Sequence, residues 1–193
     1  MSRWVVLAVC ALLLTGCSAV AREPDALELV RVLGVDGAEP VELTAVSAGN
    51  GRGIAAAKDF EEAKGRLPWS GVGKELSLTG VSYLVVGPDV DLESLIFSVL
   101  EEEELGAAIT VWLAAEGAVE MLDACEDPTA DLELLTLQGV AAPTVAQVAA
   151  ILSGNETLCL PCLAADGGRL QKRGEILWAE VQSDYRGASC LLR

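Results

Sequence analysis

The spacing of apolar and polar positions along the chain predicts its secondary structure. Apolar residues alternate or run together over short segments typical of strands, at 26–35, 41–48, 76–86, 107–114, 157–165 and 174–181. They recur every three or four positions over segments that favour helices, at 54–64, 92–103, 117–124, 132–137 and 145–152. Segment 132–137 also fits a strand, although we favour a helix. This order predicts an α/β (α+β) fold, with a mixed β-sheet, flanking helices and a single domain.

Polar and glycine-rich segments mark the ends of these elements. The pair at 36–37, Asp-Gly, predicts a hairpin between the first two strands. Thr144 and Gln147 have the spacing of a capping box that would open the last predicted helix. The glycine-rich segment 47–53 lacks the G-K-[ST] ending of a phosphate-binding loop, so we expect a flexible entry to the helix at 54–64. Asp-Gly-Gly at 166–168 predicts a turn before the final strand.

The N-terminus has the features of an export signal. Arg3 precedes an apolar run at 4–14, which is too short to span a bilayer, and the run ends in Leu14-Thr15-Gly16-Cys17. This ending resembles the lipobox of bacterial lipoproteins. The resemblance implies cleavage before Cys17, acylation of its sulfur and attachment to the membrane by lipid. We therefore expect a signal peptide at 1–16, a tether at 17–25 and a domain at 26–193.

The charge balance narrows the range of partners. The chain has 13 Lys and Arg against 29 Asp and Glu, a formal net charge of −16, and loss of Arg3 with the signal would make the balance more negative. An acidic surface argues against binding of nucleic acid and against attraction to anionic lipids, so the acyl chains would have to supply the anchor. The acidic run at 101–104 is expected to be the solvated end of a helix.

Histidine is absent from the chain. This excludes a Ser-His-Asp triad, a Cys-His dyad and histidine-ligated zinc within this chain. The sequence also offers no pair of carboxylates at a recognisable catalytic spacing. We therefore expect a non-enzymatic protein that acts by contact, without a cofactor or a bound metal.

Four cysteines would remain after removal of the signal and lipidation: Cys125, Cys159, Cys162 and Cys190. An exported chain is permitted disulfides, so all four are candidates. Cys159 and Cys162 form a C-x-P-C pair, the spacing of thioredoxin-like redox centres, but no helix is predicted to follow and stabilise a thiolate. A Cys₄ zinc site lacks a second C-x-x-C. We expect Cys159 and Cys162 to be strand residues, with one of them bridged to Cys125 or Cys190.

The order of elements resembles the N-terminal domain of the Ger(x)C family, the lipoprotein C subunits of nutrient germinant receptors in bacterial spores. The segment 33–36, Leu-Gly-Val-Asp, resembles the family's strand ending in Gly-Ile-Asp, and 74–87 resembles its lysine, apolar strand and closing glycine. The helix expected at 92–104 occupies the place of the family's amphipathic helix. Further similar segments are 108–114, 117–122, 174–178 and 187–192.

Several positions depart from the family pattern. Ser18-Ala19 replaces the usual Trp-Asp after the lipidated cysteine, Val81 replaces a histidine, and 101–106 replaces a stretch with arginines. The family's two further domains have no counterpart in these 193 residues. The resemblance implies a subunit tethered to the outer face of the inner spore membrane, with integral membrane receptor subunits as partners. The alternatives are a lipid-anchored thiol-disulfide protein using Cys159 and Cys162, and a generic lipoprotein adaptor of the cell envelope.

Overall fold

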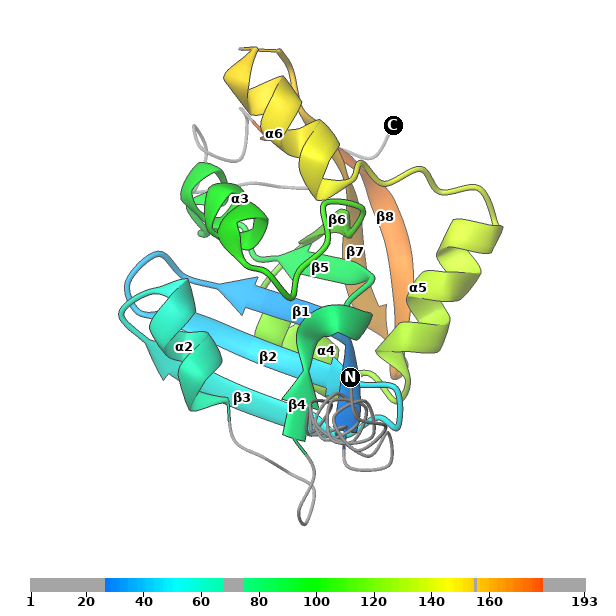
Figure 1. Ribbon diagram of the computed structural model, residues 1–193. Helices are drawn as coiled ribbons and strands as arrows, with labels where there is room; N and C mark the ends of the chain where they lie inside the picture. Colours follow the sequence, from blue (N-terminus) through cyan, green and yellow to red (C-terminus); the bar gives the residue numbers. More distant parts are fainter. Residues whose placement is uncertain (1–26, 68–74, 155, 179–193) are drawn as a thin grey trace, which may run out of the picture.

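The structure is a computed structural model that describes residues 27–67, 75–154 and 156–178 (Figure 1). These residues form one mixed sheet with helices on both faces, which confirms the predicted α/β (α+β) class and the single domain. The predicted signal peptide, the tether with Cys17, and Cys190 lie outside the described residues.

The sheet has eight strands: β1 (Leu27–Asp36), β2 (Val41–Ser47), β3 (Arg52–Ala57), β4 (Glu75–Ser77), β5 (Tyr83–Val86), β6 (Thr110–Ala114), β7 (Cys159–Asp166) and β8 (Arg169–Leu177). Seven of them follow the order β3-β2-β1-β5-β6-β7-β8, and β4 pairs with the start of β1. Strands β1, β5, β6 and β7 are parallel neighbours, so their carboxyl ends lie at the same edge. The hairpin partners β2–β3 and β8 flank this parallel centre with antiparallel pairing.

Five helices cover the sheet: α2 (Phe60–Arg66), α3 (Leu92–Glu101), α4 (Ala118–Ala124), α5 (Pro128–Leu137) and α6 (Val145–Ser153). Buried side chains of α2, α3 and α6 pack on one face, and those of α4 and α5 pack on the other. In Figure 1, α2 lies in front of β2 and β3, and α4 lies behind β1 and β2. The molecule is therefore a three-layer arrangement with two cores.

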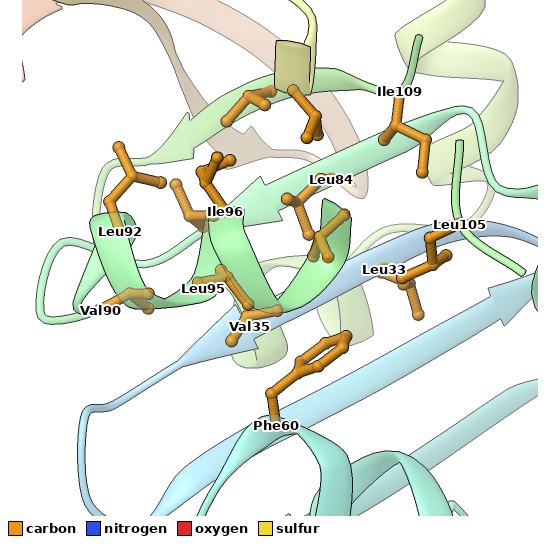
Figure 2. Packing of buried hydrophobic residues seen from close by; sticks show 14 of the residues in the cluster. Leu33, Val35, Phe60, Leu84, Val90, Leu92, Leu95, Ile96, Leu105 and Ile109 are labelled. Atoms are coloured by element: carbon orange, nitrogen blue, oxygen red, sulfur yellow. The ribbon is translucent and has the colours of Figure 1, made fainter. Parts of the chain in front are cut away.

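Burial on both faces explains the continuous apolar runs of the central strands. Successive residues of a strand point to opposite faces, so Leu84 and Val86 enter the core under α3 while Tyr83 and Val85 enter the core under α4 and α5. Figure 2 shows Leu33 and Leu84 of the sheet facing the side chains of α3 and α2. Such strands lack a polar face, which is why the sequence shows runs there instead of strict alternation.

The hairpin at the start, the helices around 92–103, 117–124 and 145–152, and the preference for a helix at 132–137 are confirmed. The predicted capping box is also present, since Thr144 Oγ1 accepts from Gln147 N at 3.3 Å and Gln147 Oε1 accepts from Thr144 N at 2.8 Å. These features depend on neighbouring residues in sequence, so local patterns suffice to find them.

The predicted entry loop and helix at 54–64 are wrong for their first half. Residues Arg52–Ala57 form strand β3, which pairs with β2 throughout, and α2 begins only at Phe60. The alanines at 55–57 suit a helix by propensity, but pairing with β2 and burial of Ala55 and Ala57 override it. Asp59 then caps the helix by accepting from Glu62 N at 2.9 Å.

The single strand predicted at 76–86 is interrupted. Strand β4 ends at Ser77, a 3₁₀ turn occupies Leu78–Gly80, and β5 begins at Tyr83. The two strands pair with different parts of β1, on either side of an irregularity between Val30 and Val32. Gly80 sits so close to β1 that a Cβ atom there would lie 3.0 Å from the Val30 carbonyl oxygen.

The last strand starts earlier than predicted, at Arg169 and not at 174. Gly167 and Gly168 both have positive φ, 56° and 79°. Two such residues make a tight hairpin turn whose twist matches that of the strands, so β7 and β8 pair from Asp166 and Arg169 onward.

Candidate functional site

The carboxylate of Asp36 organises the edge where the parallel strands end. Asp36 is the last residue of β1, and its two oxygens accept from Ala118 N and Val119 N, each at 2.7 Å. These amides open α4, which follows β6. Asp36 therefore joins the end of one central strand to the helix that follows another.

Glycines after β5 and β6 make room for this carboxylate. A Cβ atom on Gly87 would lie 1.9 Å from Asp36 Oδ1, and one on Gly117 would lie 3.3 Å from Asp36 Oδ2. Both loops consequently need a residue without a side chain, or a shift of Asp36, to close around it. A third glycine, Gly34 of β1, lets α4 approach, because its Cβ would meet Leu122 Cδ1 at 2.5 Å.

Burial raises the pKa of Asp36 above its ordinary value of 3.8. The amides of Val119 and Ala118 favour the charged form and oppose the increase, while the nearby carboxylates of Asp89 and Glu42 add to it. Desolvation is the largest of these influences. Burial of the Asp36 carboxylate therefore shifts its pKa more than the charges of Asp89 and Glu42 do.

Three segments that carry the family resemblance meet at this point. They are 33–36 at the end of β1, the closing glycine of 74–87 after β5, and 117–122 at the start of α4. Their spacing in the sequence did not indicate any contact between them. In the structure Asp36 bonds to one segment and contacts the glycine of the other.

A cleft of about 410 Å³ opens beside Asp36, between the β1–β2 turn, α2 and α3. We call it the α2–α3 cleft. Its floor is apolar and includes Val35, Phe60, Val90 and Leu95, which Figure 2 shows gathered at this end of the sheet. These four side chains are themselves buried, at 1–6% exposed, so the cleft borders the core that α2 and α3 cover.

The rim of the α2–α3 cleft is mainly acidic. Glu39, Asp59 and Asp91 line it together with one cation, Lys58. Asp91 caps α3 by accepting from Ser94 N at 3.2 Å, just as Asp59 caps α2. Capping orients these carboxylates without removing their charge, so the rim favours a segment with an apolar side chain next to basic ones.

The C-x-P-C pair lies within β7, as expected, and no helix follows it. Cys159 is exposed whereas Cys162 is fully buried. Three residues of a strand span about 10 Å, which exceeds the roughly 7 Å limit between the Cα atoms of a disulfide. The strand geometry therefore opposes a bond between these two cysteines.

The sheet separates Cys162 from Cys125. Cys162 pairs in register with Leu113 and shares its face, toward α3 and α6, while Cys125 lies in the core under α4 and α5. Burial raises the pKa of the Cys125 thiol to about 11, with Asp131 adding to the increase and Arg52 opposing it. Cys125 and Cys159 form no disulfide with another described residue. The predicted bridge from Cys159 or Cys162 to Cys190 involves a residue outside the described part of the chain and stays a prediction.

Two polar anchors of the fold were not predicted. Asp131 of α5 is 2% exposed and accepts from Arg169 Nε at 2.5 Å and from Leu170 N at 2.7 Å, which ties α5 to β8. Arg52 donates to the carbonyl oxygens of Asp123 and Cys125 at the end of α4. Both contacts join residues far apart in sequence. The only local feature that drew attention to either of them is the glycine-rich segment around Arg52.

The described helices are all too short or too polar to cross a membrane. Within residues 27–67, 75–154 and 156–178, no three metal-ligating side chains come together. Comparison of the chain with protein-family models, curated proteins and solved structures finds no match.

Replacing Asp36 with alanine is expected to lower the free energy of unfolding by about 1–2 kcal/mol. Two amides of α4 would lose their acceptor, at about 1–3 kcal/mol each when buried, while relief of the desolvated charge offsets part of that cost. Urea denaturation measures the change. Asp89→Ala is the matched control, because Asp89 accepts one exposed amide at 3.2 Å, and it should cost less than Asp36→Ala.

Comparison of the wild type with Asp36→Ala also gives a pH test. Because the pKa of Asp36 is raised on folding, the folded state takes up this proton first as the pH falls. The stability of the wild type relative to Asp36→Ala should therefore increase as the pH falls through the folded pKa, and level off below the unfolded pKa of about 3.9. A relative stability that decreases over this window would show that the amides, and not burial, dominate.

Proposed function

We propose that this protein is a lipid-anchored, non-enzymatic subunit of a nutrient germinant receptor, which acts in spore germination by contact with integral membrane subunits. The convergence of the three resembling segments on Asp36 carries the proposal. The end of β1, the glycine loop after β5 and the start of α4 would be retained as a set if they maintain one local structure at the edge of the sheet.

The anchor in this proposal is Cys17. The apolar run and Leu14-Thr15-Gly16-Cys17 support lipidation on the outer side of a membrane, and in a spore this would be the inner membrane. The acidic domain would stay soluble above the lipid surface, held by acyl chains and not by surface charge.

The α2–α3 cleft is the contact surface that we assign to the membrane subunits. The expected occupant is a segment outside the membrane with an apolar side chain flanked by lysine or arginine. The apolar side chain would cover Val35 and Phe60, and the basic neighbours would face Glu39, Asp59 and Asp91. Charge complementarity of this kind orients partners and speeds their encounter.

Deletion of the gene, in a strain without a second copy, is expected to slow germination with some nutrients. Receptor-independent triggers such as calcium-dipicolinate should act normally. Complementation then tests the cleft: Ser94→Trp places a large side chain over it from the exposed side of α3 and should fail to restore the response. Ser153→Trp, an exposed serine of α6 outside the cleft, should restore it.

Normal responses to every nutrient after deletion would argue for the generic envelope adaptor. Full rescue by Ser94→Trp, with slow germination after deletion, would leave the receptor role in place and exclude the cleft. Crosslinking from residue 94 to a multi-span subunit in spore membranes would support both parts of the proposal.

A further inference from the structure

Strand β3 forms one edge of the sheet, below β2 in Figure 1, and no described strand pairs with its outer side. It pairs with β2 along its whole length. Ile54, in the middle of β3, is paired with Thr44 on the sheet face that α4 and α5 cover, yet it is 46% exposed. The β3 edge therefore presents an apolar side chain beside an unpaired main chain.

The hydrogen-bond pattern with β2 decides which main-chain groups of β3 face outward. At the β2–β3 turn Ser47 N donates to Gly51 O at 2.8 Å, so the adjoining pair, which includes Arg52, is of the non-hydrogen-bonded kind. Every second residue of β3 repeats this arrangement. The N–H and C=O groups of Arg52, Ile54 and Ala56 consequently point away from β2.

A contact from α2 supports this assignment. Arg66 Nη1 donates to Ala56 O at 3.2 Å, which requires that this carbonyl group point outward. Among the described residues, no other side chain bonds to the outward main-chain groups of β3. A carbonyl oxygen has two lone pairs, so Ala56 O can still accept from another strand. Outward groups of this kind are a template for strand pairing.

The opposite edge of the sheet, β8, is protected against such pairing. Asp131 of α5 accepts from Leu170 N at 2.7 Å, and a register shift leaves Arg173 as the extra residue of a β-bulge. A covered amide, a bulge and a basic side chain are features by which edge strands avoid adding another strand. Residues 53–57 of β3 contain no charge and no proline, and they pair with β2 without a register shift.

The charge near β3 also differs from that of the whole chain. The segment 52–66, which contains β3 and α2, has four basic and three acidic residues, whereas the chain has 13 basic and 29 acidic ones. Within the segment Lys64 pairs with Glu61 and Arg66 pairs with Glu62. A second copy of this acidic protein can therefore approach through the β3 edge with little electrostatic repulsion.

We propose that β3 pairs antiparallel with β3 of a second copy, which gives a symmetric homodimer with one continuous sheet. A two-fold axis at Ile54 places this residue opposite itself, and it places Arg52 of each copy opposite Ala56 of the other. All three outward residues then lie in hydrogen-bonded pairs, each of which exchanges two main-chain hydrogen bonds. The strand is thus complementary to itself, as a two-fold interface requires.

The side chains of β3 fit this register. The two Ile54 side chains cover each other at the centre, where directly opposite residues of antiparallel strands contact. At each end Arg52 lies opposite Ala56, so a long side chain meets a small one. The guanidinium of Arg52 is directed toward its own α4, where it donates to the Cys125 carbonyl oxygen. No pair of bulky side chains opposes the contact between the strands.

The interface is small, so we expect a Kd of about 1–100 μM. The dimer goes beyond the receptor role proposed above. It requires neither the lipid anchor nor the α2–α3 cleft.

Disulfide trapping of the full-length protein in membranes of the expressing cells tests the register. Ile54→Cys should form dimers on mild oxidation, because hydrogen-bonded pairs have Cα atoms about 5.5 Å apart, within the range of a disulfide. Ala56→Cys is the matched control, since the two copies of this exposed residue would be about 14 Å apart. Both variants carry Cys159→Ser and Cys190→Ser to remove other thiols, and non-reducing immunoblots measure the dimer.

A second pair of variants tests the main-chain hydrogen bonds. Ala56→Pro, added to the Ile54→Cys protein, removes an N–H that points away from β2 and should lower the dimer yield about tenfold or more, the effect of losing roughly one to two hydrogen bonds. Ala56→Val retains the N–H and suits a strand, so it should crosslink as the parent does. Cooperative urea unfolding checks that both proteins are folded.

Absence of disulfide dimers with Ile54→Cys would exclude the interface, and equal crosslinking at positions 54 and 56 would indicate random collision. Undiminished dimers with a folded Ala56→Pro protein would exclude strand pairing. A disulfide from position 54 to a different protein would assign the β3 edge to another partner and overturn the homodimer. None of these outcomes changes the germination response to gene deletion, so failure here is distinguishable from failure of the proposed function.

Discussion

Replacing Cys17 with alanine is expected to transfer the protein from the membrane fraction to the soluble fraction. Each methylene of an acyl chain buried in the bilayer contributes about 0.8 kcal/mol, and two or three chains hold a protein firmly. The net charge of −16 opposes attraction to anionic lipids, and no helix of the described residues can cross a membrane. The transfer should therefore be nearly complete.

Carbonate washing of membranes followed by immunoblotting measures this redistribution. Cys10→Ala is the matched control, because it makes the same substitution in the apolar run seven residues earlier, where lipidation is not expected. It should leave the protein in the membrane fraction. Retention of Cys17→Ala after the wash would contradict the lipobox, whatever the domain does in germination.

Replacing Trp112 with alanine is expected to lower the free energy of unfolding by about 4 kcal/mol. Trp112 lies in β6 among the central parallel strands, is 0% exposed, and is the largest fully buried side chain of the described residues. Its loss leaves a cavity under α4 and α5 that rigid strands on both sides cannot close. The free energy of unfolding of a single domain totals only about 5–15 kcal/mol, so this loss is a large share of it.

Urea denaturation with an unchanged m-value would measure this loss cleanly. Trp112→Phe is the control, since it retains most of the ring volume while losing the hydrogen bond from Nε1 to Thr110 Oγ1, at 3.0 Å. A cost of about 1–2 kcal/mol is expected for this variant. Equal costs for alanine and phenylalanine would show that the hydrogen bond, and not the packing, supports this core.

Local patterns in the sequence were sufficient for much of the architecture. The capping box at Thr144 and Gln147, the apolar stripe of α3 and the hairpin at Asp36-Gly37 involve residues within a few positions of one another. Each pattern can be recognised within a few residues, although the stripe of α3 gains its stability by packing on distant strands. The fold class followed because alternating strands and helices have few ways to bury their apolar faces.

Tertiary contacts decided the features that local propensity describes poorly. The alanines at 55–57 favour a helix by intrinsic propensity, but they form part of β3 because they pair with β2. The strand predicted at 76–86 is interrupted near Gly80, whose backbone lies close to β1. In each case hydrogen bonds and packing from distant residues exceeded an intrinsic preference worth less than about 1 kcal/mol per residue.

The candidate sites depended on the tertiary structure most of all. Asp36 reaches amides 82 and 83 positions away, and the α2–α3 cleft is lined by the β1–β2 turn, the start of α2 and α3. No periodicity links such residues, since the crossovers between parallel strands separate them in the chain while the sheet brings their ends together. The export signal is the opposite case: Arg3, the apolar run and Cys17 form a contiguous pattern, so the sequence was enough to predict it.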